Sequence, residues 1–544
     1  MRTRTQSFIQ AGKGGPGLGP WLWSVLWCVV YLIAHLWLFW MKPKRFPEFE
    51  IGLQLLLLAA VFVRRKGQES GLRARIQIPR RLLVTGILIF LGGGLAANRI
   101  ITQGRLISDE TAYSFQSRIF ASGHFKAPAP PSTVFFEHHI IDRSGWFTKF
   151  PPGWPVVLAV SSMAGVGWAV NILLGIVILG IVFAIGKRLY SDREARLALF
   201  LLLLSPIFFG NCLGQMSHPL CGALLAGATL FYFRARQDGA LWNVAAMLSG
   251  IVLATTVRPL TGVLFGLVLG GALLWEIRHD RRRLWATAAL CGLFAVVAVC
   301  LSGAYNYEMT GHFTKFPYAE FSRTAIPVEL IPGANAGGAL RWSLIGTWAF
   351  TFPLLFPAAG LALFRDREKR REAVVLAALF LCLVAGYAPN RYPSGSFLGE
   401  RFYFEGFFAV PLLAARGIVL FEKSWEAGQR ATLYLGALAV SALITLGFSL
   451  PAVFHEVKPY IQVRALAGTL PFRNAVVFLS THDPEFIAKH FNLNEADWPV
   501  APIFIAPDPG REERQAIADA LGRSTWAVIS YDPVLGKAEL KSEH

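Results

Sequence analysis

The sequence predicts an α-helical polytopic membrane protein with about 13 transmembrane helices, followed by a small extramembrane α/β domain. Of its 544 residues, 54% are hydrophobic and 16% are charged, whereas soluble chains carry roughly 25% charged residues. Apolar runs close to the roughly 20 residues needed to cross a bilayer recur along the chain. The basic residues gather in short loops between these runs, which is the positive-inside pattern.

That pattern places the N-terminus and the basic loops in the cytoplasm. The loops at 99–168 and 304–340 then lie outside. Residues 152–166 are short and marked by Gly and Pro, so we expect a re-entrant or interfacial helix there. The expected spans cover residues 21–40, 50–63, 82–98, 169–186, 195–211, 216–233, 241–257, 259–276, 285–303, 342–363, 373–389, 403–420 and 431–450.

The chain divides into three predicted parts. Residues 1–81 form a transmembrane hairpin with a basic cytoplasmic loop, 82–451 a catalytic transmembrane module, and 452–544 a small periplasmic α/β domain. In the last part, short apolar runs alternate with helical patterns, which is typical of α/β units. It carries no glycine-rich phosphate loop or nucleophile motif, so we expect an accessory or acceptor-recognition role. The expected strands are 474–480, 502–506 and 526–531, and the expected helices are 483–491 and 511–522.

Composition also excludes several classes of function. The net charge of +18 comes from the cytoplasmic loops, so we expect a bilayer and not nucleic acid as the partner. The six cysteines all fall in apolar runs without a Cys-x-x-Cys motif, which argues against disulfides and zinc sites. The first span lacks a small-residue cleavage site, so we expect it to be retained. A multi-pass protein of a bacterial plasma membrane fits these features.

The most informative motif is the acidic pair Asp109-Glu110, which follows the span at 82–98 and opens the first external loop. Carboxylates next to hydrocarbon are costly and usually functional. The pair also suits an ordinary helix start, because Ser108 precedes a helix expected over 111–121. Both interpretations can hold, since a helix beginning at the pair would anchor the loop at the bilayer.

Cationic residues near the same face accompany this pair. Lys149 is a candidate for binding a lipid phosphate, or an interfacial lysine beside Trp146 and Trp154. Arg258 follows an apolar span and is either a phosphate-binding group or an interfacial anchor. Arg391, Tyr392 and Arg401 belong to a polar loop and are further candidates for substrate binding, although Arg401 and Glu405 could form a simple pair one helical turn apart.

A second polar cluster, Glu137-His138-His139, lies in the first external loop. Adjacent histidines point to different sides of a strand or helix, and no His-x-x-x-His or cysteine partner is present. We therefore expect sugar or acceptor contacts or a plain polar loop, and no metal site.

A base beside cations fits one reaction class. The base deprotonates an acceptor hydroxyl while the cations hold a leaving phosphate, as in glycosyl transfer from a polyprenyl-phosphate sugar. The leaving group is already an anion, so neither a metal nor another cofactor is required.

Several motifs over roughly 80–450 resemble the GT-C superfamily of integral-membrane glycosyltransferases. The related families include protein O-mannosyltransferases (glycosyltransferase family 39-like), the lipid A aminoarabinose transferase and lipopolysaccharide-core transferases. The motifs are Asp109-Glu110, Lys149 before Pro151-Pro152, Arg258-Pro259, Tyr305-Asn306-Tyr307 with Thr310-Gly311, and Arg401 through Glu405-Gly406 to Leu413-Ala414-Ala415-Arg416-Gly417.

The resemblance implies roles for three residues. The acid of the first external loop is the catalytic base in that superfamily, which corresponds to Asp109, and Glu110 matches the second acid of the Asp-Glu form. Lys149 resembles the Lys-Pro lysine of aminoarabinose transferases, although Phe150 is inserted before the prolines. The N-terminal hairpin is an addition to the simplest form.

The expected function is therefore transfer of a sugar from a polyprenyl-phosphate donor to a hydroxyl of a cell-envelope acceptor, with inversion or retention left open. The alternative is a lipid or glycan transporter or flippase. Such proteins often contain internal repeats with polar groups near the midplane. Here the halves show no repeat, and the polar residues gather at one face.

Overall fold

The structure is a computed structural model. It describes residues 78–102, 107–131, 139–142, 144–322, 336–352, 355–389, 395–396, 399–421, 444–470, 474–481, 494–532 and 537–543, with a few isolated positions between them. The spans expected at 21–40 and 50–63 lie outside these residues, as do most positions of the first half of the span expected at 431–450.

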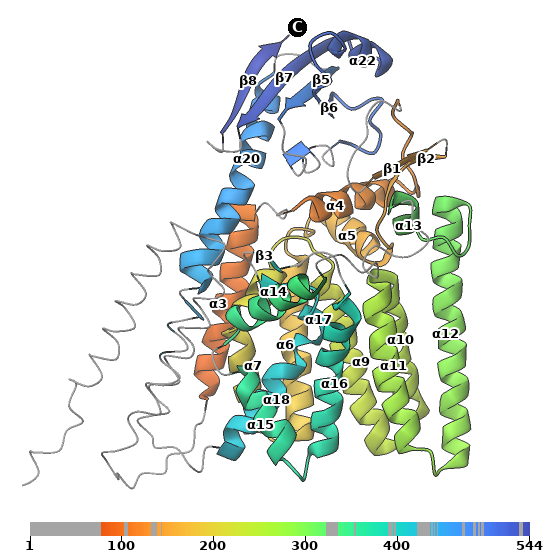
Figure 1. The fold of residues 1–544 in the computed structure, drawn as a ribbon, viewed down its shortest axis with the longest axis vertical. Coiled ribbons are helices and arrows are strands. Elements are labelled where there is room, and N and C mark those ends of the chain that lie inside the picture. The colour runs from red at the N-terminus through yellow and green to blue at the C-terminus, as the bar shows by residue number, and fades with distance from the viewer. Residues whose placement is uncertain are drawn as a thin grey trace, which may run out of the picture.

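A bundle of long helices forms the lower part of the molecule (Figure 1). Within the described residues, five helices are long and apolar enough to cross a membrane, or six if one bent pair counts as a span. The predicted total of about 13 is therefore not confirmed. The bundle comprises α3 (Arg80–Ala96) with η4 (Ala97–Thr102), α6 (Val170–Leu189), α7 (Asp192–Leu203), α9 (His218–Asp238), α10 (Leu241–Val257), α11 (Pro259–Glu276), α12 (Arg281–Thr310), α15 (Leu355–Arg365), α16 (Arg370–Tyr387), α17 (Phe404–Phe407) and α18 (Ala409–Phe421).

Two spans predicted as single helices are broken. Residues 195–211 form α7 and α8 (Pro206–Cys212), bent by 66°, because Pro206 has no N–H for an intrahelical bond and its ring crowds the preceding turn. Residues 342–363 divide between α14 (Ala336–Ala349) and α15. The two breaks contact each other, since the Ile207 N–H donates to the Phe350 carbonyl at 2.8 Å. A backbone group that lacks an intrahelical partner at one break thus finds a partner at the other break.

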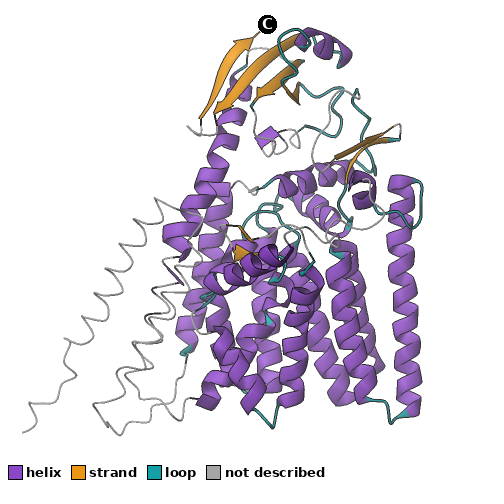
Figure 2. Ribbon diagram, viewed as in Figure 1, coloured by secondary structure: helices purple, strands orange, loops and turns teal. Residues whose placement is uncertain are grey.

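Shorter elements lie above the bundle (Figure 2). Among them, α5 has 11 residues, or about 16 Å of helix, which is too short for a hydrocarbon core of about 30 Å. This agrees with the expectation for 152–166. The elements in this layer are α4 (Ser108–Ala121), the antiparallel hairpin of β1 (His139–Asp142) and β2 (Gly145–Thr148), α5 (Gly153–Met163) and α13 (Pro317–Ser322). Two short strands, β3 (Gly395–Ser396) and β4 (Gly399–Glu400), pair before α17.

The chain leaves the bundle through η7 (Ile444–Ser449) and α20 (Leu450–Thr469) and ends in a four-stranded sheet. The predicted boundary at 452 therefore falls inside α20. The strand order is β6-β5-β7-β8, parallel except for the antiparallel β7–β8 pair. The sequence did not predict β8, because its charged Lys and Glu residues, which are common in edge strands, mask the apolar pattern of a strand. The bounds are β5 (Ala475–Ser480), β6 (Ile503–Pro507), α22 (Arg514–Ala520), β7 (Thr525–Asp532) and β8 (Lys537–Glu543).

The sheet packs directly on the layer that carries α4. Phe115 of α4 and Trp146 of β2 are fully buried in one hydrophobic cluster with Phe478 and Phe504 of the sheet. The Arg118 guanidinium of α4 also donates to the Asn494 carbonyl at 2.8 Å. Large buried aromatic side chains contribute strongly to such cores. The C-terminal sheet thus holds α4 from above, while its extramembrane location stays a prediction.

The crossing of α15 and α18 gives a test of the bundle packing. A Cβ added at Gly417 would overlap the Ala358 carbonyl oxygen, whereas one added at Gly360 of α15 would meet nothing within 4 Å. Overpacking a close helix contact costs about 1–3 kcal/mol, so we expect Gly417→Ala to lower the melting temperature in detergent. Gly360→Ala serves as the matched control and should leave it equal or higher, because Ala favours helix. Equal melting temperatures for the two variants would show that this crossing is not closely packed.

Candidate active site

The acidic pair lies in the first turn of α4, and its two carboxylates have different surroundings. Adjacent residues on a helix do not face the same side. The Glu110 side chain is fully buried, whereas the Asp109 side chain is 19% exposed. The helix start that the sequence predicted is present, but Ile107, and not Ser108, is the cap residue.

Glu110 anchors the start of α4 to a buried turn. Its Oε2 accepts the Ile107 N–H at 3.2 Å, and its Oε1 accepts the Gln215 N–H at 3.0 Å. Gly214 precedes this second donor with φ +73°, and a Cβ there would collide with the Glu110 carboxylate. A buried carboxylate is tolerated when hydrogen bonds satisfy it. Glu110 was predicted as the second acid of the site. Its contacts fix the start of α4 and thereby position the neighbouring Asp109.

The same turn, which we call the 213–217 turn, receives side chains from three further elements. The Gly214 N–H donates to Asn98 of η4 at 2.9 Å, and Asn171 of α6 donates to the Gly214 carbonyl at 3.1 Å. Trp154 of α5 donates to the Gln215 carbonyl at 2.6 Å. These bonds satisfy backbone groups that would otherwise be buried without partners. The turn therefore fixes the start of α4 relative to η4, α5 and α6.

Asp109 faces a cation on the opposite side of the site. Arg401 Nη2 lies 3.3 Å from Asp109 Oδ2. The suggested pair between Arg401 and Glu405 is wrong, because α17 begins only at Phe404. Arg401 therefore precedes the helix, and helical spacing does not apply to it.

Tyr113 lies one turn after Asp109 on α4 and is buried. Its hydroxyl is 3.2 Å from Ser217 Oγ, and its ring is 4.3 Å from that of Phe150. Burial, and then the negative charge of Asp109, raise the pKa of the Tyr113 phenol well above its usual value. The phenol thus stays neutral and can act as a hydrogen-bond donor or acceptor.

Arg258 joins α10 to α11 and is held from three sides. Its Nε lies 3.0 Å from Glu405 Oε1, and its guanidinium packs over the rings of Tyr387 and Phe402 at 5.8 and 5.4 Å. Glu405 Oε1 is also 2.8 Å from His218 Nδ1, and both of these side chains are fully buried. A cation fixed in this way is pre-organised to meet a developing negative charge.

Lys149 follows β2 and is 7% exposed. Its ammonium lies 4.7 Å from the centre of the Tyr318 ring and 5.5 Å from that of Phe150. The Tyr305 hydroxyl donates to the Phe150 carbonyl at 3.0 Å, which fixes the backbone after the lysine. Because the Phe150 ring also packs on Tyr113, Lys149 is tied to the helix of Asp109.

Five further predicted substrate-binding residues stay predictions. Glu137, His138, Arg391 and Tyr392 lie outside the described residues, and only the backbone of His139 is described, within β1. Within the described part of the chain, no three His, Cys, Asp or Glu side chains are grouped as metal ligands would be.

The Leu-Ala-Ala-Arg-Gly motif has a different place. Arg416 of α18 binds Asp366 at 2.6 Å and Glu194 at 2.9 Å. Asp366 belongs to the connection between α15 and α16, at the opposite end of the bundle from α4 (Figure 1). This motif joins α18 to α7 and to the α15–α16 connection, and it lies away from Asp109.

Tyr113, His218 and Tyr387 belong to the site but were not predicted from the sequence. Their contacts join residues more than 100 positions apart, so no local pattern marks them. One signal was present for His218, since it stands in an apolar stretch directly before Pro219 at a helix start.

The role of Glu110 can be tested by stability. We expect Glu110→Gln to lower the free energy of unfolding by about 1–3 kcal/mol, because its amide would leave a buried backbone donor without an acceptor. Asp109→Asn removes one partly exposed ion pair and should cost under about 1 kcal/mol. Melting temperatures of the two purified variants in one detergent give the comparison. A Glu110→Gln protein as stable as Asp109→Asn would contradict the anchoring role.

Comparison with known proteins gives the fold. No protein-family model and no curated protein sequence matches this chain. Among solved structures, ArnT from Cupriavidus metallidurans, bound to undecaprenyl phosphate, is similar with a TM-score of 0.53 and 15% identity, over 84% of this chain and 93% of that one. The oligosaccharyltransferase AglB from Archaeoglobus fulgidus, in complex with an inhibitory peptide and a dolichol-phosphate, gives 0.50 and 12%, over 84% and 73%. The chain therefore has the fold of the GT-C glycosyltransferases.

Proposed function

We propose that this protein is an integral-membrane glycosyltransferase that moves a sugar from a polyprenyl-phosphate donor to a hydroxyl of a cell-envelope glycan, lipid or protein. The observation that carries the proposal is the partly exposed Asp109 carboxylate, 3.3 Å from Arg401. The Arg401 guanidinium packs on the Phe402 ring at 5.8 Å, and Arg258 contacts the same ring at 5.4 Å. The GT-C fold, seen in one protein bound to undecaprenyl phosphate and in another with dolichol-phosphate, supports a lipid-phosphate donor.

In the proposed reaction, Asp109 accepts the proton of the acceptor hydroxyl while that oxygen bonds to the anomeric carbon of the sugar. The bond between this carbon and the phosphate oxygen breaks, and its electron pair leaves with the polyprenyl phosphate. General base catalysis of this kind contributes typically 10²–10⁴-fold. Arg401 keeps the carboxylate oriented, and Glu110 keeps its helix in register with the 213–217 turn.

Arg258 and Lys149 are proposed to hold the donor phosphate. Both are cations with little exposure and are fixed by aromatic rings. Arginine suits phosphate because its planar fork can bind two oxygens at once. Glu405 and His218 hold Arg258 in place and so act as positioning residues. The positive-inside pattern supports an orientation in which this site and the C-terminal sheet are periplasmic and the N-terminus is cytoplasmic.

The proposed base is tested with membranes that contain the full chain. They are incubated with a panel of labelled polyprenyl-phosphate sugars, and the label is followed into envelope material. We expect Asp109→Asn to lower transfer by about 10²–10⁴-fold and to leave undecaprenyl phosphate binding nearly intact. Asp497→Asn is the matched control, because it removes an exposed carboxylate from the C-terminal region, and it should transfer like the unmodified protein. Retained turnover in Asp109→Asn would refute the assigned base.

The phosphate-binding role of Arg258 predicts a loss of donor affinity. Arg258→Ala is combined with Glu405→Gln so that no buried carboxylate loses its cation. A hydrogen bond to a charged group is worth about 1.5–3 kcal/mol, so we expect the dissociation constant for undecaprenyl phosphate to rise roughly 10- to 100-fold. Arg282→Ala removes an exposed cation at the start of α12 and should not change it. Unchanged affinity in both the double variant and Lys149→Ala would contradict the assignment.

A further inference from the structure

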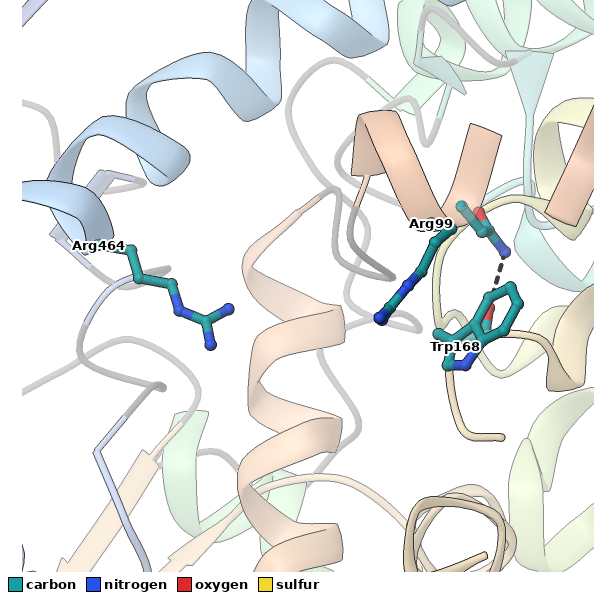
Figure 3. Close-up of a pocket in the computed structure, with 4 residues that line it drawn as sticks. Arg99, Trp168 and Arg464 are labelled. Atoms are coloured by element: carbon teal, nitrogen blue, oxygen red, sulfur yellow. Dashed lines mark hydrogen bonds between the residues drawn. The ribbon is translucent and has the colours of Figure 1, made fainter. Parts of the chain in front are cut away.

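A separate pocket opens beside the proposed active site, between η4, the α5–α6 connection and α20. It has a volume of about 400 Å³ and is lined by Asn98, Arg99, Trp168 and Arg464. Figure 3 shows the side chains of Arg99 and Arg464 reaching toward each other from opposite walls. Volumes of this size accommodate small ligands or headgroups.

The two arginines give the pocket a strong positive charge. Among the described residues, neither guanidinium forms an ion pair. Arg99 packs over the Trp168 ring, with its guanidinium carbon 5.7 Å from the ring centroid. Two like charges that face each other across a pocket repel, and an anion between them removes that repulsion. Two guanidinium forks match the oxygens of a phosphate group best.

The wall of the pocket is rigid on one side. Asn98 is fully buried, and its amide donates to the Trp168 carbonyl at 3.1 Å while its oxygen accepts the Gly214 N–H at 2.9 Å. Asn98 thus has both ends of its amide occupied and fixes the position of Trp168. The ring of Trp168 then restricts the Arg99 side chain through the cation–π contact.

The pocket lies where two candidate membrane spans end, because Arg99 is the next-to-last residue of the span Arg80–Ile100 and Trp168 stands just before the span Val170–Leu189. Ile100, next to Arg99, and Met163, at the end of α5, are each 72% exposed. Tryptophan and arginine beside exposed apolar residues are typical of the membrane–water interface. A lipid with its headgroup at the ends of these spans would place its chains along the bundle, whereas a soluble anion would gain nothing from that position.

We infer that this pocket binds the phosphate of a membrane-lipid headgroup between Arg99 and Arg464. The site shares no residue with Asp109, Lys149, Arg258 or Arg401, so it does not depend on the proposed transferase reaction. It is connected to that site through the Asn98–Gly214 hydrogen bond and through the bond from the Gln215 side chain to the Gly167 carbonyl.

Native mass spectrometry of the purified full chain with added phosphatidylglycerol tests this inference. We expect Arg99→Gln with Arg464→Gln to weaken retention of one phosphatidylglycerol molecule at least tenfold, and Arg282→Gln to leave it unchanged. Arg464→Glu is a second variant that supplies a carboxylate opposite Arg99, so it should also lose the lipid while folding normally. Diacylglycerol, which lacks the phosphate, should not bind at this site.

Two results would overturn the inference. If all variants retain phosphatidylglycerol equally, the pocket does not bind the headgroup. If inorganic phosphate binds as tightly as phosphatidylglycerol and displaces it, the pocket is a site for free anions and the lipid assignment is wrong. Undecaprenyl phosphate binding in Arg258→Ala/Glu405→Gln is measured separately, so failure of the donor site and failure of this site give different results.

Discussion

The buried 213–217 turn is the constraint on which the arrangement of the site depends. Its backbone hydrogen bonds are made by side chains from η4, α4, α5 and α6. The turn also ends where α9 begins, so His218 enters the bundle next to Glu405 and, through it, Arg258. The carboxylate of Asp109 and the guanidinium of Arg258 come from distant parts of the chain, and this one turn relates their positions.

The acidic pair divides two tasks between neighbouring residues whose side chains point in different directions. Helical geometry turns Glu110 inward, where two backbone N–H groups bind it, and leaves Asp109 partly exposed beside Arg401. The C-terminal sheet adds a second restraint, since Phe115 and Trp146 share its core. Asp109 is therefore on a helix that is held at its start by the turn and along its length by the sheet. Such rigid support is what a proton-accepting group needs, because small displacements reduce catalysis strongly.

Local patterns predicted those features that local physics determines. The spans 241–257 and 259–276 coincide with α10 and α11, because Arg258-Pro259 interrupts two apolar runs and proline is well suited to a helix start. The strands of the C-terminal sheet were visible as short β-branched runs, apart from the charged edge strand β8. The breaks near Pro206 and before α15 were missed, since an apolar run looks the same whether or not its helix is continuous. The partners of Arg258 and Arg401 were assigned wrongly or not at all, because they arise from contacts between distant segments.

The central claim is that one site brings the Asp109 carboxylate together with cations that hold a polyprenyl phosphate. An electron cryomicroscopy structure of the full chain with undecaprenyl phosphate bound tests it most directly. The account predicts the phosphate within hydrogen-bonding distance of Arg258 or Lys149, on the side of α4 that presents Asp109. A phosphate located elsewhere, with Asp109 turned away from it, would contradict the account.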